Sequence, residues 1–423
     1  MDSAEMPRFL PFSVLLSFIL LPALPAQAMD FTWSGFGTIG YAQSDQSFKY
    51  QRFISEHGTV KRDSVLGAQV DFKFDQHWGA AIQGKVAPSE KSDASWQGVL
   101  SWAFVSWRPA DDWLIRAGKL RVPLMLNTEN QDVGMTYDLA RLPLEVYSIV
   151  PTTDFVGLSI SKSWLLDNVE WTVDAYSGRA ENYTRYYGRE IKDGAPTPGS
   201  WFQKLNVTSS GLVLSVHGID NMFRAGIHEA AVSKPGGFIS DIPYRRIAPG
   251  FGYFDIASGR NVDSIVIPVQ NIGISLLMPW DVRVTGEYAR MKVTTASRGF
   301  TRWGSYFSVS RQFGAWTPYV YYAKVKSTDA SLGLYQAVNS NRSSLFGDAL
   351  NDYQALAADI VSPFDQWSGA LGASYRLTPR SMLKAEWSHI QTGVASSFVD
   401  APSGSDSGDR HFNVLSLSYS FTF

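Results

Sequence analysis

The strict alternation of the last thirteen residues, HFNVLSLSYSFTF, does most to limit how this chain can fold. The side chains of one parity are apolar or aromatic: Leu415, Leu417, Tyr419, Phe421 and Phe423. Those of the other parity mostly carry a hydroxyl: Val414, Ser416, Ser418, Ser420 and Thr422. Because successive side chains of a strand point to opposite faces, one face is greasy and the other polar. The pattern suits a sandwich edge strand whose apolar face is covered by another layer, or a transmembrane β-barrel whose apolar face meets lipid.

The N-terminal residues favour the transmembrane β-barrel over the sandwich. Residues 1–28 have the layout of a secretory signal peptide, with a charged head, an apolar run over 9–21 and a small-x-small triplet ending at Ala28. The apolar run is shorter than the ~20 residues that a membrane-spanning helix needs. We expect translation to start at Met6 and the signal to be cleaved after Ala28. The exported domain is then 29–423.

Composition narrows the class further. Aromatic residues make up 14% of the chain, and its formal net charge is −2. Lipid-facing barrels have this mixture, since polar residues of the lumen dilute the apolar ones. The chain has no cysteine, which excludes disulfides and thiolate metal sites. We expect no cofactor, no metal site and no nucleic-acid partner.

Segments of alternating character recur along the chain and are separated in turn by short turns and long polar loops. An even number of strands with such connections is what bacterial outer-membrane barrels require. We therefore predict an all-β, transmembrane antiparallel barrel of about sixteen strands that encloses a water-filled channel. A helix is also expected within 350–358. The predicted strands are 31–42, 64–74, 78–87, 98–108, 113–121, 155–164, 168–177, 211–217, 222–230, 265–277, 281–292, 300–312, 316–326, 366–377, 381–391 and 411–423.

Three short stretches resemble Gram-negative porins: GFGTIGYA at 35–42, RAGKLRVP at 116–123 and the terminal YSFTF. The resemblance implies a homotrimer in the outer membrane, in which the third loop folds into each pore. It also implies that Phe423 is a recognition signal for the barrel-assembly machinery. The Pro-Glu-Phe-Gly-Gly motif of that family's third loop is absent, which indicates a divergent branch.

The predicted third loop, 122–154, is acidic, whereas the predicted inner wall has a basic excess. The loop acids are Glu129, Asp132, Asp138 and Glu145. Strand parity points nine basic residues inward: Lys73, Lys85, Arg116, Arg224, Arg283, Arg302, Lys324, Arg376 and Lys384. It points five acids inward: Asp71, Glu170, Asp174, Glu287 and Glu386. Opposed charges across a narrow gap favour small polar solutes, so we expect a pore constriction between the loop and the wall.

These observations predict a porin that lets small hydrophilic solutes and ions diffuse passively across the outer membrane, in contact with lipid and lipopolysaccharide. The alternative is a substrate-specific channel of the same architecture, for a sugar or an anion. Arg179, Arg185 and Arg189 either bind anions at the mouth or belong to a solvated loop. A barrel enzyme or an adhesin is a further alternative, but no motif links the histidines to a nucleophile and an acid. Three aspartates could hold a divalent cation among lipopolysaccharides: Asp400, Asp406 and Asp409.

Overall fold

The computed structural model describes residues 30–190, 199–293 and 300–423. The predicted signal peptide, 1–28, lies outside the described residues. Among the described residues, no helix is long and apolar enough to cross a membrane.

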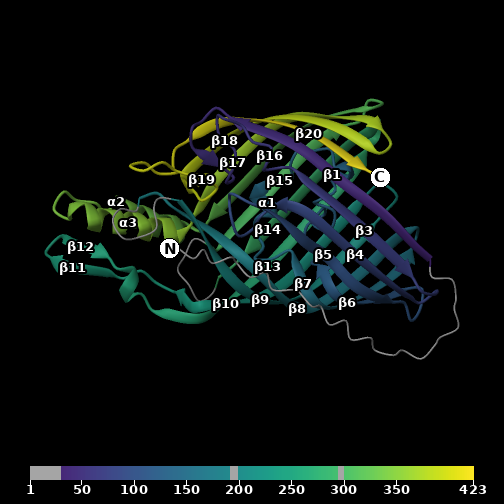
Figure 1. The fold of residues 1–423 in the computed structure, drawn as a ribbon, viewed down its shortest axis with the longest axis horizontal. Helices are drawn as coiled ribbons and strands as arrows, with labels where there is room; N and C mark the ends of the chain where they lie inside the picture. The colour runs from purple at the N-terminus through teal and green to yellow at the C-terminus, as the bar shows by residue number, and fades with distance from the viewer. Residues whose placement is uncertain (1–29, 191–198, 294–299) are drawn as a thin grey trace, which may run out of the picture.

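Sixteen of the described strands form one closed antiparallel barrel, in which each strand pairs with its neighbours and β1 pairs with β20 (Figure 1). The predicted fold class and strand number are therefore confirmed. The barrel strands are β1 Asp30–Ser44, β3 Val65–Lys73, β4 Trp78–Pro88, β5 Trp96–Trp107, β6 Trp113–Arg121, β7 Asp154–Leu166, β8 Val169–Gly188, β9 Gly199–His217, β10 Met222–Ile239, β13 Asn261–Met278, β14 Val282–Met291, β15 Arg302–Arg311, β16 Trp316–Ser327, β17 Phe364–Thr378, β18 Ser381–Ser396 and β20 His411–Thr422.

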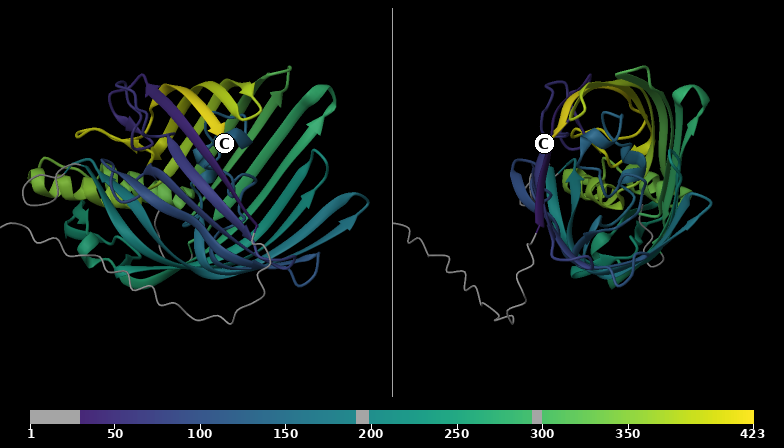
Figure 2. Two further views of the ribbon diagram at one scale, coloured as in Figure 1. Left: turned by 45° about the vertical axis from the view of Figure 1, so that its right-hand side comes forward. Right: turned by 90° about the vertical axis from the view of Figure 1, so that its right-hand side faces the viewer.

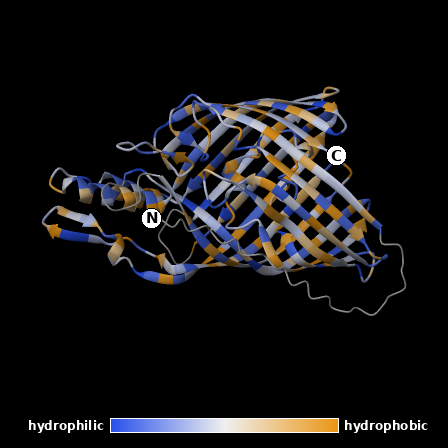
Figure 3. Cartoon of the chain, in the orientation of Figure 1, coloured by the Kyte–Doolittle hydropathy of each residue, from blue (hydrophilic) through white to orange (hydrophobic). Residues whose placement is uncertain are grey.

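The outer surface of the barrel is apolar. Leu66, Ile82, Leu100 and Val156 are between 48 and 59% exposed, and Figure 3 shows hydrophobic and hydrophilic residues alternating along the strands. A soluble monomer rarely exposes so extensive an apolar surface, whereas a barrel in lipid requires it. In β20 the predicted faces are confirmed, since the leucines are exposed and Ser416, like the other serines, is buried. The chain is a transmembrane barrel of the outer-membrane type.

Short turns gather at one end of the barrel and long connections at the other. The C-terminus lies at the short-turn end in Figure 1. The turn between β7 and β8 has positive φ at Asp167 (48°) and Asn168 (63°), as the tight turns that match the twist of a hairpin require.

The long-loop end carries the remaining elements. Two small sheets pair β2 (Lys49–Tyr50) with β19 (Val399–Asp400) and β11 (Tyr244–Ala248) with β12 (Phe251–Phe254). The predicted helix is α3 (Gly347–Val361), and it packs beside α2 (Asp329–Ser340), which was not predicted. Short 3-10 helices are η1 Gly134–Thr136, η2 Ile256–Ser258 and η3 Pro279–Asp281.

The third loop, residues 122–153, lies inside the barrel. It carries η1 and the single-turn helix α1 (Leu144–Tyr147). Figure 2 (right) looks along the barrel from the short-turn end, and this loop, in blue, lies within the ring of strands. Its buried side chains Leu124, Met125 and Val146 belong to a cluster with apolar wall residues from β9, β10 and β13. The loop thus packs against the inner wall through apolar groups, as its sequence predicts.

Candidate functional site

The third loop is attached to β4 and β6 through Asp132. Lys85 Nζ lies 2.7 Å from the carboxylate of Asp132, and Arg121 Nη2 lies 3.0 Å from it. Arg121 also bridges to Asp154, at 3.2 Å, where β7 begins. Burial alone would raise the pKa of Asp132, but the two cations outweigh it and hold that pKa below its usual value. Asp132 is therefore an ionised anchor of the loop.

A second attachment joins the loop to β10 and β14. Arg224 donates to the carbonyl oxygen of Met125 at 2.8 Å and pairs with Glu129 at 3.0 Å. The carboxylate of Glu287 accepts the backbone N–H of Leu126 at 2.7 Å. A backbone group bonded to a buried ion resists displacement, because breaking the bond leaves the ion unpaired.

Helix α1 forms the third attachment. The hydroxyl of Tyr147 donates to Glu287 at 2.7 Å. Glu145 is buried and accepts from the amide of Gln366 at 2.9 Å and from the hydroxyl of Ser368 at 2.8 Å. Glu145, predicted as a pore-lining acid, thus points at the wall of β17.

The side of the loop near β16 to β18 is attached as well. The hydroxyl of Ser374 donates to Asp138 at 2.7 Å, and Lys384 Nζ donates to the carbonyl oxygen of Leu139 at 2.9 Å. The backbone N–H of Ala140 donates to the hydroxyl of Tyr319 at 2.8 Å. Contacts on these several sides make the loop a fixed partition across part of the lumen.

Two glycines let backbone and wall approach closely. A Cβ on Gly134 of the loop would lie 2.3 Å from Ser420 Oγ and 2.6 Å from Thr38 Oγ1. A Cβ on Gly304 of β15 would lie 2.0 Å from the carbonyl oxygen of Glu145. Both positions therefore require a residue without a side chain.

A chamber of about 670 Å³ lies between the third loop and the long-loop end. Its size falls within the ~300–1,000 Å³ of pockets that hold small molecules. Seven cationic side chains line it against three carboxylates, Asp63, Glu90 and Asp132. The cationic residues are Arg52, Arg62, Lys85, Arg141, Arg185, Arg302 and Lys384.

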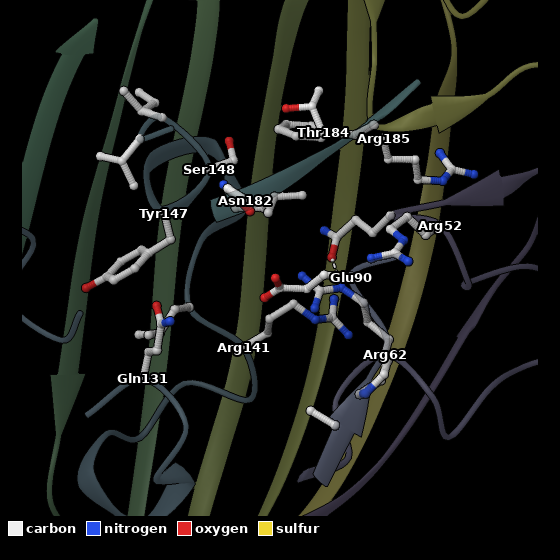
Figure 4. A pocket seen from close by; sticks show the side chains of 18 of the residues that line it. Arg52, Arg62, Glu90, Gln131, Arg141, Tyr147, Ser148, Asn182, Thr184 and Arg185 are labelled. Carbon is white, nitrogen blue, oxygen red and sulfur yellow. Dashed lines mark hydrogen bonds between the residues drawn. The ribbon is translucent and has the colours of Figure 1, made fainter. Parts of the chain in front are cut away.

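Arg62 and Arg141 lie together in this chamber (Figure 4). Arg141 pairs with Asp63, with Nε 2.7 Å from Oδ1, and holds the pKa of Asp63 below its usual value against the effect of burial. Arg62 donates from Nε to the side-chain oxygen of Gln51 at 2.9 Å. Burial, and then the positive charge of Arg141, lower the pKa of Arg62 to about 10.

Ion pairs cross the mouth above the chamber. Arg185, on β8, pairs with Asp93 at 2.9 Å and with Asp400 at 2.6 Å. Arg52, in the first loop, pairs with the same Asp93 at 2.8 Å. Asp400 is thus engaged by an arginine, and across residues 30–190, 199–293 and 300–423 no cluster of three or more metal-binding side chains occurs.

The structure distributes the nine predicted basic residues unequally. Lys85, Arg302 and Lys384 line the chamber, and Arg224 holds the loop. Arg116 packs near the ring of Phe104, 6.0 Å from its centroid, on the inner wall. Lys73, Arg283 and Arg376 lie near the short turns, away from the chamber.

The predicted inward orientation of Lys324 is wrong. It shares the face of Val320 and Tyr322, which are 48 and 49% exposed on the outside of the barrel. The inward face of β16 carries Tyr319 and Tyr321 instead, whose hydroxyls both donate to Glu386. Aromatic residues on both faces of this strand conceal its parity.

The most consequential residues that the predicted sites omit are Arg121 and the pair Asp63 and Arg141. Arg121 ends a strand and is buried, and it donates to the carbonyl oxygen of Thr128 in the third loop at 3.3 Å. A signal was available for the pair: Arg141 is the one basic residue within an acidic loop, which suggests an acidic partner elsewhere in the chain.

Two of the histidines on the strands, His228 and His389, have structural partners. His228 is buried between the hydroxyl of Tyr176 at 2.9 Å and the amide oxygen of Asn271 at 2.8 Å. His389 contacts Asn413 at 3.0 Å. Neither arrangement places a serine and a carboxylate on the two sides of one imidazole, as a triad does.

Phe423 lies at the seam of the barrel. Its backbone N–H and C=O pair with Gly35 at 3.0 Å, and its ring stacks on Phe421 and meets Trp33 edge-on at 5.7 Å. The ring also covers Gly35, where a Cβ would lie 2.1 Å from it.

No protein-family model matches the chain, and no curated protein matches it. Solved structures do. OprB of Pseudomonas putida, in its high-pH structure, aligns with a TM-score of 0.53 and 9% identity over 93% of this chain and 94% of OprB. The anion-selective porin of Comamonas acidovorans aligns with a TM-score of 0.50 and 9% identity over 93% of this chain and 100% of that porin. The trimer form of the outer membrane protein OmpT of Vibrio cholerae aligns with a TM-score of 0.50 and 10% identity, over 94 and 100% of the two chains.

Proposed function

Starting from the outer-membrane porin fold that this chain shares with those structures, we propose that it is a channel for passive diffusion. The solutes are small, hydrophilic molecules and ions. One observation carries the proposal: a third loop, bonded to the inner wall on several sides, narrows a lumen without removing its water-sized space. A packed core would need no chamber of 670 Å³.

The charged groups around the loop set the selectivity of this channel. Glu129 and Asp132 each face a cation of the wall, Arg224 and Lys85 respectively. Because these loop acids are paired, the cations that remain give the chamber a positive excess. A water-filled path lined by one sign of charge enriches the opposite ion, so anions are favoured.

The same fold supports a proposal for the partners. We propose a homotrimer, as the trimer form of Vibrio cholerae OmpT is described. The apolar outer surface would contact outer-membrane lipid and, at the long-loop end, lipopolysaccharide. The aromatic residues at the end of β20, and Phe423 directly after it, would be recognised by the barrel-assembly machinery.

The direct test is conductance. The chain, refolded in detergent and added to a planar bilayer, should produce discrete current steps that scale linearly with voltage. A chain that lacks 411–423 cannot close the barrel and is the matched control. A folded barrel that conducts no ions would refute the proposal.

A further inference from the structure

The chamber has two chemically different sides. Figure 4 shows Arg52, Arg62 and Arg141 gathered on one side together with Glu90, and Tyr147 across from them. The third loop also contributes partly exposed apolar residues to the lining, Leu144 and Val150. A charged side facing an apolar side matches an amphipathic solute.

Arg62 shares its nearest counter-charge, Asp63, with Arg141. Within the described part of the chain, Arg52 and Arg141 each have a carboxylate within 4.0 Å, but Arg62 has none and bonds only the neutral amide of Gln51. The single carboxylate of Asp63 faces two neighbouring guanidinium groups, so one positive charge remains in excess in a partly buried space. A further anion beside Arg62 would balance that excess charge and accept hydrogen bonds in the planar geometry that arginine favours.

We propose that the chamber binds a small organic anion, with its carboxylate on Arg62 and Arg141 and its apolar body against Tyr147 and Val150. This inference rests on the proposed channel function and specifies the class of solute that binds in the chamber. Inorganic anions would leave the apolar side uncovered, and neutral sugars would leave the guanidinium groups unpaired. Organic cations would be repelled.

Benzoate is the probe, because it joins a carboxylate to a flat apolar ring. Benzamide has the same shape without the charge, and benzylammonium has the opposite charge. Each is added to wild-type channels in a planar bilayer and titrated by calorimetry into the refolded barrel in detergent. Benzoate should block the current and bind at least about tenfold more tightly than either control, since a charge-assisted hydrogen bond accounts for about that factor.

The variants locate the site. Arg62→Gln removes the charge and should weaken benzoate block by roughly tenfold, whereas Arg62→Lys should weaken it less. Arg246→Gln is the matched control, because Arg246 lies exposed on β11, donates to the carbonyl oxygen of Ala248, and is absent from the chamber lining. This variant should bind benzoate as wild type does.

The outcomes separate this inference from the channel function. Equal block by benzoate and benzamide, or an unchanged Arg62→Gln, overturns the anion site while conductance leaves the channel function in place. Calorimetric binding of benzoate that depends on Arg62, in a barrel that does not conduct, supports the site and refutes the channel function. If Arg62→Gln fails to fold, the comparison of the three probes on the wild-type chain decides.

Discussion

Replacing Gly304 with alanine should displace the third loop without opening the barrel. The new Cβ would lie 2.0 Å from the carbonyl oxygen of Glu145 and 2.7 Å from the side chain of Ile149. Ordinary contact begins near 3.4 Å, so helix α1 must move by about 1.4 Å toward the pore axis. The ladder hydrogen bonds of β15 involve only the backbone and stay in place.

The cost can be estimated from the contacts. Overpacking of this kind costs about 1–3 kcal/mol. Moving α1 also weakens the hydrogen bonds from Gln366 and Ser368 to the buried Glu145, which adds about 1–3 kcal/mol. Together these reduce the free energy that holds the loop in place by about 2–6 kcal/mol. The barrel should still fold, but its single-channel conductance should fall and its current noise should rise.

Gly286→Ala is the matched control, since a Cβ at Gly286 on β14 would have its nearest neighbour at 3.6 Å. Conductance steps are compared in a planar bilayer, after heat-modified migration on a gel has verified that both variants fold. If the conductance of Gly304→Ala equals that of wild type and of Gly286→Ala, the loop does not rest on β15 and the reasoning fails.

Three further predictions concern charge, assembly and topology. Replacing Asp132 and Asp138 with asparagine should free wall cations and shift the reversal potential toward anions; the shift should shrink as the Debye length falls from ~10 Å at 0.1 M salt to ~3 Å at 1 M. If this variant keeps wild-type selectivity at low salt, the loop does not line the constriction. Deleting Phe423 removes ~1.5–3 kcal/mol of burial, yet membrane-inserted protein should drop much further if the residue is a recognition signal; unchanged insertion contradicts that role. An epitope inserted at Ser340 should be labelled by antibody on intact cells, and labelling only after permeabilisation would reverse the assigned topology.

The fold was largely predictable because lipid imposes a strict rule on each strand: apolar side chains face outward and alternate with polar ones that face the lumen. The rule weakens where the third loop covers the inner wall. Ile265, Ile267 and Val269 face the loop, while Ile272 and Ile274 face outward, so this part of the chain is apolar on both faces. The predicted strand there has the right position but an obscured parity.

The rule also fails beyond the membrane. Strand β9 begins at Gly199, whereas the alternation indicates a start at 211. Residues 203–208 of that extension are mostly polar, since water or other loops cover them and no lipid selects their faces. Helix α2 was missed for the same reason, although Thr328 caps it by accepting the backbone N–H of Ser331.

The site was less predictable than the fold because its contacts join distant segments. A predicted acid, Asp132, and a predicted base, Lys85, meet as an ion pair, since charge balance draws such residues together. The pairing of Arg141 with Asp63, 78 residues away, depends on the path of the loop through the barrel. No local pattern encodes that path.

The pairing of β1 with β20 has a consequence for the speed of folding. Thr38 and Ser420 meet across this seam although 382 residues separate them. Loop-closure entropy must be lost before such distant contacts compensate, so this step is intrinsically slow. Until β20 arrives, β1 presents an unpaired edge to which another chain can add, and aggregation competes with closure. The rate at which the last strand finds the first therefore determines how long each new chain needs protection.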